Sequence, residues 1–273
     1  MAYATAKVYI QQAERAIRVE LFFPTDLPEV GDNVRGVITL LHGLSNSSLE
    51  WPHLTAAYRY ASDKGYILVI PEAQNSFYND MYYGAPFFSI LTKYLPEQLN
   101  RIFRIPSDAA INHIAGNSMG GYGALRIGLA NPDRYRCIGS FSGAVDIAAL
   151  AEAAAALNQP NDFLVPVLGP KREVLPQADT FWLLEQAAAL PTAKQPRVLA
   201  TCGLQDIEPY DILAQNRRLA AHAKGLPIDY RYLEWEGAHE WYFWDRSLVE
   251  FIAFIENDDY ATQKKAQWTA PVT

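Results

Sequence analysis

The segment at residues 116–120, Gly-Asn-Ser-Met-Gly, could present a nucleophilic serine. An apolar run at 111–115 precedes it, and a glycine-rich stretch typical of a helix start follows it. A serine on a tight strand-to-helix turn needs small flanking residues, and the turn leaves its hydroxyl exposed at the strand end. A glycine-rich turn without catalytic function is the alternative. The context favours Ser118 as a nucleophile.

A serine hydroxyl is a weak nucleophile near neutral pH, so it needs a base, and the base needs an orienting acid. His239 follows a predicted strand in the segment Glu-Gly-Ala-His, and Asp206 follows another predicted strand after a glycine turn. The order Ser118, Asp206, His239 is the order of triad residues in α/β-hydrolases. Asp206 is preferred to the other nearby acids, Glu208, Asp211 and Asp245, because it directly follows its strand.

The tetrahedral intermediate of acyl transfer needs backbone N–H donors for its oxyanion. One donor normally belongs to the residue after the nucleophile, here Met119. The second normally comes from the loop after an early strand, and the sequence Leu-His-Gly-Leu at 41–44 occupies that place. We assign this donor to Leu44; the alternative is that His42 and Gly43 form an ordinary strand-end turn.

Predicted strands and helices alternate from residue 35 onward, which favours a mostly parallel sheet with helices on both faces. An N-terminal hairpin is predicted at 8–12 and 16–23. The later strands are predicted at 37–41, 66–70, 110–115, 137–141, 197–201 and 228–235. The helices are predicted at 52–64, 87–103, 120–130, 210–224 and 241–255. The fold class is therefore α/β, with the pattern of an α/β-hydrolase fold in a single domain over 1–273.

One region, 146–192, is too long for a simple connection between a strand and the next element. It is alanine-rich and then proline-rich. It is interpreted either as a surface insertion containing helices or as a small cap over the site.

Composition excludes several function classes. The chain has 273 residues, half of them hydrophobic, and a net charge of −7. An acidic chain without a basic run is a poor candidate for nucleic acid or an anionic membrane surface. No segment has the pattern of a signal peptide or a membrane span, so a cytoplasmic location is expected. The two cysteines lack metal-type spacing and are expected to be inert buried thiols, and no metal or other cofactor is expected.

These motifs resemble the esterase D and tributyrin-esterase-like branch of the α/β-hydrolases. The similar stretches include LLHGLSNSSLEW, PEAQNSFYNDMYYGAPFF, IAGNSMGGYGALRIGLANPDRY, SFSGAVDI and EWEGAHEWYFWDRSL, within roughly 36–147 and 197–252. The resemblance implies a metal-independent serine carboxylesterase for short acyl groups, with Ser118, Asp206 and His239 as its triad. Relatives often assemble, so a homo-oligomer is expected. Asn117 is a departure, since many relatives carry another residue before the serine.

Aromatic residues near the predicted site are candidates for lining an acyl pocket. They are Trp51, Tyr78, Tyr82, Tyr83 and Trp241. The loop at 77–83 is interpreted as a substrate-facing rim or as a loop packed on the core, since aromatic residues with polar tips suit both. Bulky residues near Ser118 would favour acetyl to butyryl chains over long lipids.

Three alternatives to a short-chain esterase remain open. One is a thioesterase of the S-formylglutathione hydrolase type, which would share the triad. Another is a feruloyl or acetylxylan esterase, in which the region 146–192 would hold an aromatic acyl group or a sugar. The third is a catalytically silent α/β-hydrolase that only binds ligands, although such proteins usually lack a triad member.

Overall fold

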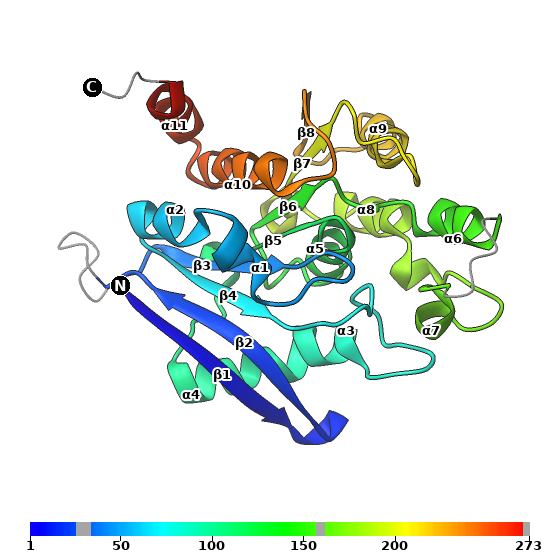
Figure 1. Ribbon diagram of the computed structural model, residues 1–273, viewed down its shortest axis with the longest axis horizontal. Coiled ribbons are helices and arrows are strands. Elements are labelled where there is room, and N and C mark those ends of the chain that lie inside the picture. The colour runs from blue at the N-terminus through cyan, green and yellow to red at the C-terminus, as the bar shows by residue number, and fades with distance from the viewer. Residues whose placement is uncertain (26–33, 157–161, 270–273) are drawn as a thin grey trace.

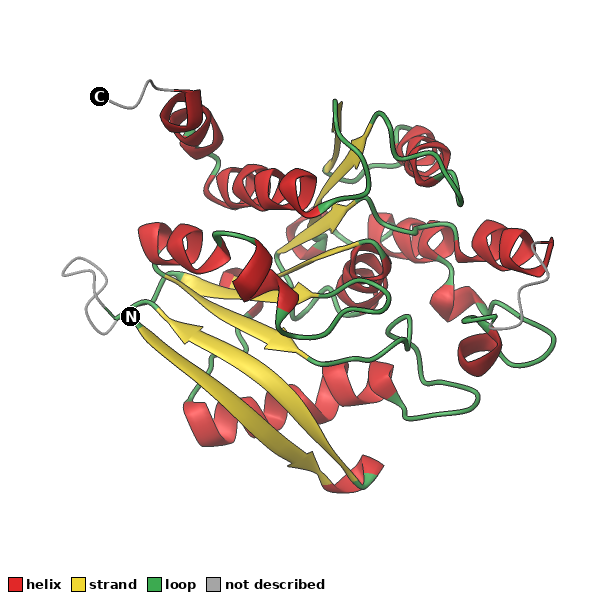
Figure 2. Ribbon diagram, in the orientation of Figure 1, coloured by secondary structure: helices red, strands yellow, loops and turns green. Residues whose placement is uncertain are grey.

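The computed structural model describes residues 1–25, 34–156 and 162–269 and is built around one eight-stranded sheet (Figures 1 and 2). The strand order is β1-β2-β4-β3-β5-β6-β7-β8. The strands are β1 (Ala2–Ile10), β2 (Arg15–Phe23), β3 (Gly36–Leu41), β4 (Tyr66–Pro71), β5 (Asn112–Asn117), β6 (Cys137–Phe141), β7 (Arg197–Gly203) and β8 (Tyr230–Trp235). β1 and β2 pair antiparallel with each other, and β2 pairs antiparallel with β4. All pairs from β4 to β8 are parallel, which confirms the predicted mostly parallel sheet.

Helices cover both faces of the sheet. The α-helices are α1 (Glu50–Leu54), α2 (Ala57–Lys64), α3 (Phe87–Ser89), α4 (Leu95–Phe103), α5 (Met119–Ala130), α6 (Ile147–Ala156), α7 (Val165–Leu168), α8 (Thr180–Ala188), α9 (Ile212–Ala223), α10 (Trp241–Glu256) and α11 (Tyr260–Thr269). One apolar layer contains side chains of α4, α5, α8 and α9. The other contains side chains of α1, α2, α10 and α11.

β3 illustrates how one strand serves both layers. Its alternate side chains point to opposite faces, so Val37 and Leu41 enter one layer and Ile38 and Leu40 enter the other. Burial on both faces explains why the strand is a continuous apolar run rather than an alternating one.

Several predicted boundaries differ from the structure. The helix predicted at 52–64 is two helices, because Thr55 is extended between them and the Asp245 carboxylate accepts a hydrogen bond from the Ala56 N–H. The helix predicted at 87–103 contains a π-helical segment, Ile90–Tyr94, directly before Pro96. The strand predicted at 110–115 begins only at Asn112, after a 3₁₀ turn at Ala109–Ile111. Helix α11 and the first residues of β1 were not predicted.

The region 146–192 contains α6, α7, α8 and two short 3₁₀ turns, Pro176–Ala178 and Thr192–Lys194. Residues 157–161 of this region lie outside the described residues. α8 packs along α5, and α6 and α7 extend beyond the sheet at the side where α5 begins (Figure 1). No helix in the described ranges is long and apolar enough to cross a membrane.

Candidate active site

Ser118 lies on a sharp turn between β5 and α5. Its backbone has φ 56° and ψ −120°, an unfavourable conformation for a residue with a side chain. A Cβ on Gly116 would lie 2.4 Å from the Gly120 carbonyl oxygen, and one on Gly120 would lie 2.3 Å from that of Leu41. Only glycine fits at either position, so the two glycines permit the close approach of β3, β5 and α5 that this turn requires.

The structure brings the three predicted triad side chains together. His239 Nε2 lies 2.8 Å from Ser118 Oγ, and His239 Nδ1 lies 2.8 Å from Asp206 Oδ2. The Asp206 side chain is 1% exposed and the His239 side chain 35%. A buried carboxylate on Nδ1 leaves Nε2 free to accept a proton from the serine. The indole ring of Trp244 stands edge-on to the imidazole, with 5.0 Å between the ring centroids.

The turns that carry the acid and the base touch each other. A Cβ on Gly203 would lie 2.1 Å from the Gly237 carbonyl oxygen. That same oxygen accepts a hydrogen bond from the Gln205 N–H at 3.0 Å, and the Gly237 N–H donates to Gln205 Oε1 at 2.7 Å. These contacts fix the turn after β7 against the turn after β8, and so place Asp206 beside His239.

The other acids considered from the sequence as partners of His239 lie elsewhere in the structure. Asp245 accepts hydrogen bonds from the Ala56 N–H and the Tyr60 hydroxyl. Asp211 caps the start of α9. Glu208 is exposed and lines the pocket at Ser118 without contacting His239 through a hydrogen bond. Among the acids considered from the sequence, Asp206 alone meets the imidazole.

The two predicted oxyanion donors are unpaired amides. Met119 is the first residue of α5, so its N–H has no partner within the helix. Leu44 lies in the loop after β3 and lines the pocket beside Ser118. Within the described residues, neither N–H donates a hydrogen bond to another group of the protein. Both amides are therefore available for an oxygen atom bound at Ser118.

A pocket opens at Ser118 and His239. Its lining also includes Leu44, Phe77, Ala144, Leu150, Phe163, Glu208, Tyr210 and Ile212. Phe163 stacks on Phe77 with ring centroids 5.7 Å apart, and Tyr210 meets Phe163 edge-on at 5.9 Å. Two of these residues, Leu150 and Phe163, come from the region 146–192, so this region borders the site.

Most of the aromatic residues predicted to line the pocket have other positions. Trp51 and Tyr78 are fully buried, so neither can contact a substrate. Their polar atoms support the loop after β3: Trp51 Nε1 donates to the Leu41 carbonyl, and the Tyr78 hydroxyl donates to that of His42. Trp241 packs between the rings of Trp51 and Trp244 instead of lining the pocket.

Tyr82 and Tyr83 are exposed by 62% and 59%, but they do not line the pocket at Ser118. Their backbone N–H groups donate to the Val167 and Pro166 carbonyls of α7. The two tyrosines therefore hold the loop at 77–83 against the region 146–192. Within that loop, Phe77 lines the pocket and was not predicted.

Within residues 1–25, 34–156 and 162–269, the two cysteines and the possible metal ligands form no second site. Burial raises the pKa of Cys137 to about 11 and also raises the pKa of Cys202, so both thiols are protonated near neutral pH. Both are buried and unpaired. In the part of the chain that the structure describes, no three His, Cys, Asp or Glu side chains are grouped as metal ligands.

Comparison with known proteins decides the family. The model of the family described as "putative esterase" matches residues 10–255. The chain belongs to this esterase family. As a member of the putative esterase family it is a carboxylic ester hydrolase, and its fold is the predicted α/β-hydrolase fold.

Individual relatives of this esterase are more distant. It is 25% identical to an acetyl esterase of Caldicellulosiruptor saccharolyticus, over 93% of this chain and 98% of that protein. The Staphylococcus aureus serine hydrolase FphF superposes with a TM-score of 0.79 at 24% identity, covering 94% of this chain and 99% of FphF. A ferulic acid esterase superposes with a TM-score of 0.77 at 19% identity, covering 94% and 97%.

Proposed function

We propose that this esterase hydrolyses short-chain acyl esters through Ser118, His239 and Asp206. His239 takes the Ser118 proton as the serine oxygen attacks the ester carbonyl carbon. The Leu44 and Met119 amides stabilise the negative charge on the former carbonyl oxygen. The imidazolium, oriented by Asp206, then protonates the departing alcohol, and water repeats these steps on the acyl-enzyme.

The observation that carries this proposal is the unbroken chain of short contacts from Asp206 through His239 to Ser118 Oγ, next to two unpaired amides. The preference for acetyl to butyryl groups is supported by the bulky rings of Phe77, Phe163 and Tyr210 in the pocket. The name of the acetyl esterase relative is consistent with the same preference.

The charges of the pocket favour this proposal over a glutathione thioesterase. Apart from the triad, Glu208 is the one charged residue among the described residues that line the pocket. No lysine or arginine is among them. S-formylglutathione carries two carboxylates and one ammonium group, so its net charge is negative, and a lining with one carboxylate and no cation does not attract it. We therefore infer that the preferred substrates are uncharged esters.

An aromatic acyl or alcohol group is the second candidate for the substrate. The stack of Phe77 on Phe163, with Tyr210 edge-on to it, offers ring faces and edges suited to another aromatic ring. Methyl ferulate and phenyl acetate test this candidate, for the acyl and the alcohol side respectively.

The main test is a rate series with p-nitrophenyl acetate, butyrate, octanoate and palmitate on the wild type and on Ser118→Ala. We expect the highest kcat/KM on acetate or butyrate, and a loss of about 10⁴-fold or more in the variant. Unchanged activity of Ser118→Ala would remove the nucleophile assignment. A maximum at palmitate would overturn the short-chain preference, and S-formylglutathione turned over faster than every ester would favour the thioesterase.

A further inference from the structure

The three backbone carbonyls that precede Leu44 in the chain, those of residues 41–43, each have a side-chain hydrogen-bond partner. Trp51 Nε1 donates to the Leu41 carbonyl at 3.0 Å, and the Tyr78 hydroxyl donates to the His42 carbonyl at 2.8 Å. The Gly43 carbonyl lies 2.9 Å from His42 Nδ1 and also accepts a longer hydrogen bond, at 3.3 Å, from the Asn46 N–H. The next backbone polar group is the unpaired N–H of Leu44.

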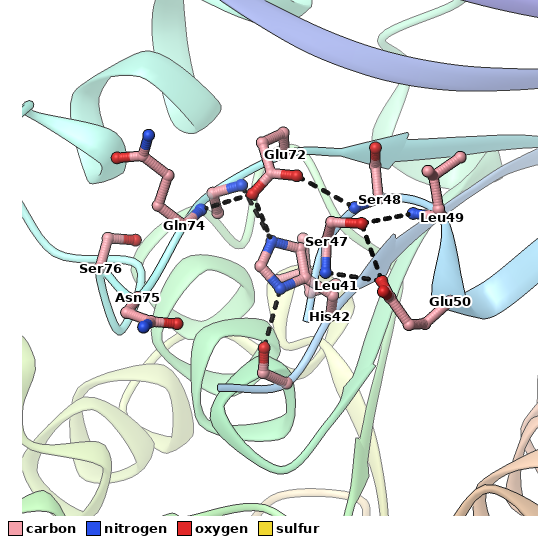
Figure 3. A network of polar contacts seen from close by, with 12 residues as sticks. Leu41, His42, Ser47, Ser48, Leu49, Glu50, Glu72, Gln74, Asn75 and Ser76 are labelled. Carbon is pink, nitrogen blue, oxygen red and sulfur yellow. Dashed lines mark hydrogen bonds and ion pairs between the residues drawn. The ribbon is translucent and has the colours of Figure 1, made fainter. Parts of the chain in front are cut away.

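The contacts of His42 determine where its proton is. The ring is fully buried, and its Nε2 lies 3.0 Å from the Ala73 backbone nitrogen (Figure 3). Glu72 Oε1 also lies 3.4 Å from Nε2, but the Ala73 N–H is closer, at 3.0 Å, and can only donate, so we assign Nε2 as an acceptor without a proton. The proton of the neutral ring is therefore on Nδ1, from which it is donated to the Gly43 carbonyl.

Glu72 holds the two loops around His42 together. Its carboxylate accepts hydrogen bonds from the Ser48 N–H at 3.2 Å and the Gln74 N–H at 2.8 Å (Figure 3). One of these donors follows β3 and the other follows β4. The distance between the His42 ring and the Ala73 N–H is fixed by this connection.

The Gly43 carbonyl and the Leu44 N–H belong to one peptide unit. A trans peptide is planar, with its C=O and N–H pointing in opposite directions. A group that fixes the Gly43 carbonyl therefore also fixes the direction of the Leu44 N–H. That N–H belongs to a residue lining the pocket beside Ser118.

We propose that His42 is a positioning residue that holds the Gly43–Leu44 peptide with its N–H directed to the oxyanion. It does so through Nδ1–H, while Ala73 sets the tautomer from the other side of the ring. The hydrogen bonds of His42 thereby connect the chain after β4 to the Gly43–Leu44 peptide. This inference rests on the proposed function, in which the Leu44 amide is an oxyanion donor.

Two substitutions separate the two ring contacts. His42→Asn places an amide nitrogen where Nδ1 lies, so it keeps a donor for Gly43 and loses the acceptor for Ala73. His42→Gln places its amide oxygen near Nε2, so it keeps the acceptor and loses the donor. We expect His42→Gln to lower kcat on p-nitrophenyl butyrate by about tenfold or more, with KM within about twofold, and His42→Asn to retain kcat within about threefold.

The inhibition constant of a transition-state mimic is a second measurement, and it would not change selectively if His42 had a purely structural role. Butaneboronic acid forms a tetrahedral adduct on a serine, with one boron oxygen at the oxyanion position. Its inhibition constant should rise in His42→Gln by about the factor lost in kcat/KM, whereas that of the product butyrate should stay unchanged. Tyr78→Phe is the matched control: it removes a hydrogen bond from the preceding peptide, so it should lower the melting temperature with little effect on boronate binding.

Equal losses in both His42 variants, with boronate and butyrate binding weakened alike, would overturn the proposal, as would full activity of His42→Gln. If His42→Gln does not fold, the tautomer is tested in the wild type by two-bond ¹H–¹⁵N NMR of the histidine rings. A proton on His42 Nε2 would overturn the proposal, because Nδ1 could not then donate. Activity retained by Ser118→Ala would instead refute the proposed function, and the NMR result would still decide the geometry of His42.

Discussion

The loop after β3 and the aromatic border of the pocket both face Ser118, but they are held in different ways. The loop is fixed by directional hydrogen bonds to Leu41, His42 and Gly43. The border is formed by ring contacts, such as Phe163 on Phe77. Hydrogen bonds fix orientation, whereas apolar contacts fill volume with little directional preference. The comparison teaches that changes at the Gly43–Leu44 peptide should alter kcat and that changes in the aromatic border should alter substrate choice.

The largest expected effect tests whether the directional hydrogen bond between Asp206 and His239 also controls kcat. Asp206→Asn should lower kcat on p-nitrophenyl butyrate by about 10³–10⁴-fold, because an amide favours the wrong tautomer of His239. The measurement is steady-state kinetics on folded protein. Asp211→Asn is the matched control, since asparagine also caps a helix start and should leave kcat nearly unchanged. Equal losses in the two variants would contradict the assignment of Asp206.

A second prediction concerns β5, the strand that supports Ser118. Burial, together with Arg136 and Arg197, lowers the pKa of His113 to about 3. The ring is neutral in the folded protein but binds a proton below about pH 6.5 when unfolded. Stability is therefore fully present above pH 6.5 and is lost as the pH falls toward 3.

His113→Phe removes this titration and keeps a ring against Tyr66. Urea unfolding at pH 7 and 4.5 should show that the variant loses about 2–3 kcal/mol less stability than the wild type over this range. His53→Phe, at an exposed position of α1, is the control and should follow the wild type. An acid-induced loss in His113→Phe as large as that of the wild type would contradict the buried neutral ring.

A third prediction tests the aromatic border directly. Phe163→Ala enlarges the pocket, so the ratio of kcat/KM on octanoate to that on acetate should rise by about tenfold, with acetate turnover within about threefold. Phe181→Ala removes a ring from the same region, 146–192, but outside the pocket lining, and should leave the ratio unchanged. A fall in kcat on every chain length would mean that Phe163 also fixes the catalytic geometry, and the contrast between the two regions would fail.

The smallest effect concerns the charge at the pocket. Glu208→Gln should raise kcat/KM on an anionic ester, 4-acetoxybenzoate, by about two- to threefold relative to phenyl acetate, because an exposed carboxylate repels weakly through water. The difference should disappear at high salt. Asp211→Asn removes an equal charge near the same loop and serves as the control. A salt-independent change would show that the side chain acts by shape.

The sequence was sufficient to predict the parts of the site that follow strand ends. Ser118 comes directly after β5, and Asp206 and His239 lie in the turns that follow β7 and β8. Parallel strands bring their carboxyl ends to one edge of a sheet. The mostly parallel sheet and the approximate ranges of its strands could be inferred from the alternation of strands and helices. β6 begins and ends at the residues predicted, and all five of its residues are buried.

The substrate-facing residues could not be predicted in this way. Aromatic side chains have the same composition signal whether they are buried, as Trp51 and Tyr78 are, or line a pocket, as Phe77 does. Only tertiary packing distinguishes them. Phe163 and Leu150 lie in a region without a regular strand-helix pattern, so nothing in the local sequence related them to Ser118. His42 was noted only as part of the segment 41–44, because the contact that sets its tautomer comes from Ala73, which is distant in the chain.

The contact between Gly203 and Gly237 has a consequence for how the catalytic residues move. Because neither glycine has a side chain that could separate the two turns, Asp206 and His239 form one rigid part, carried by β7 and the edge strand β8. The serine belongs to another part, formed by β3, β5 and α5. Displacement between the two parts changes the distance from His239 to Ser118 and leaves the distance from His239 to Asp206 unchanged. Heating or pressure should therefore uncouple the nucleophile from its base while the base still holds its acid.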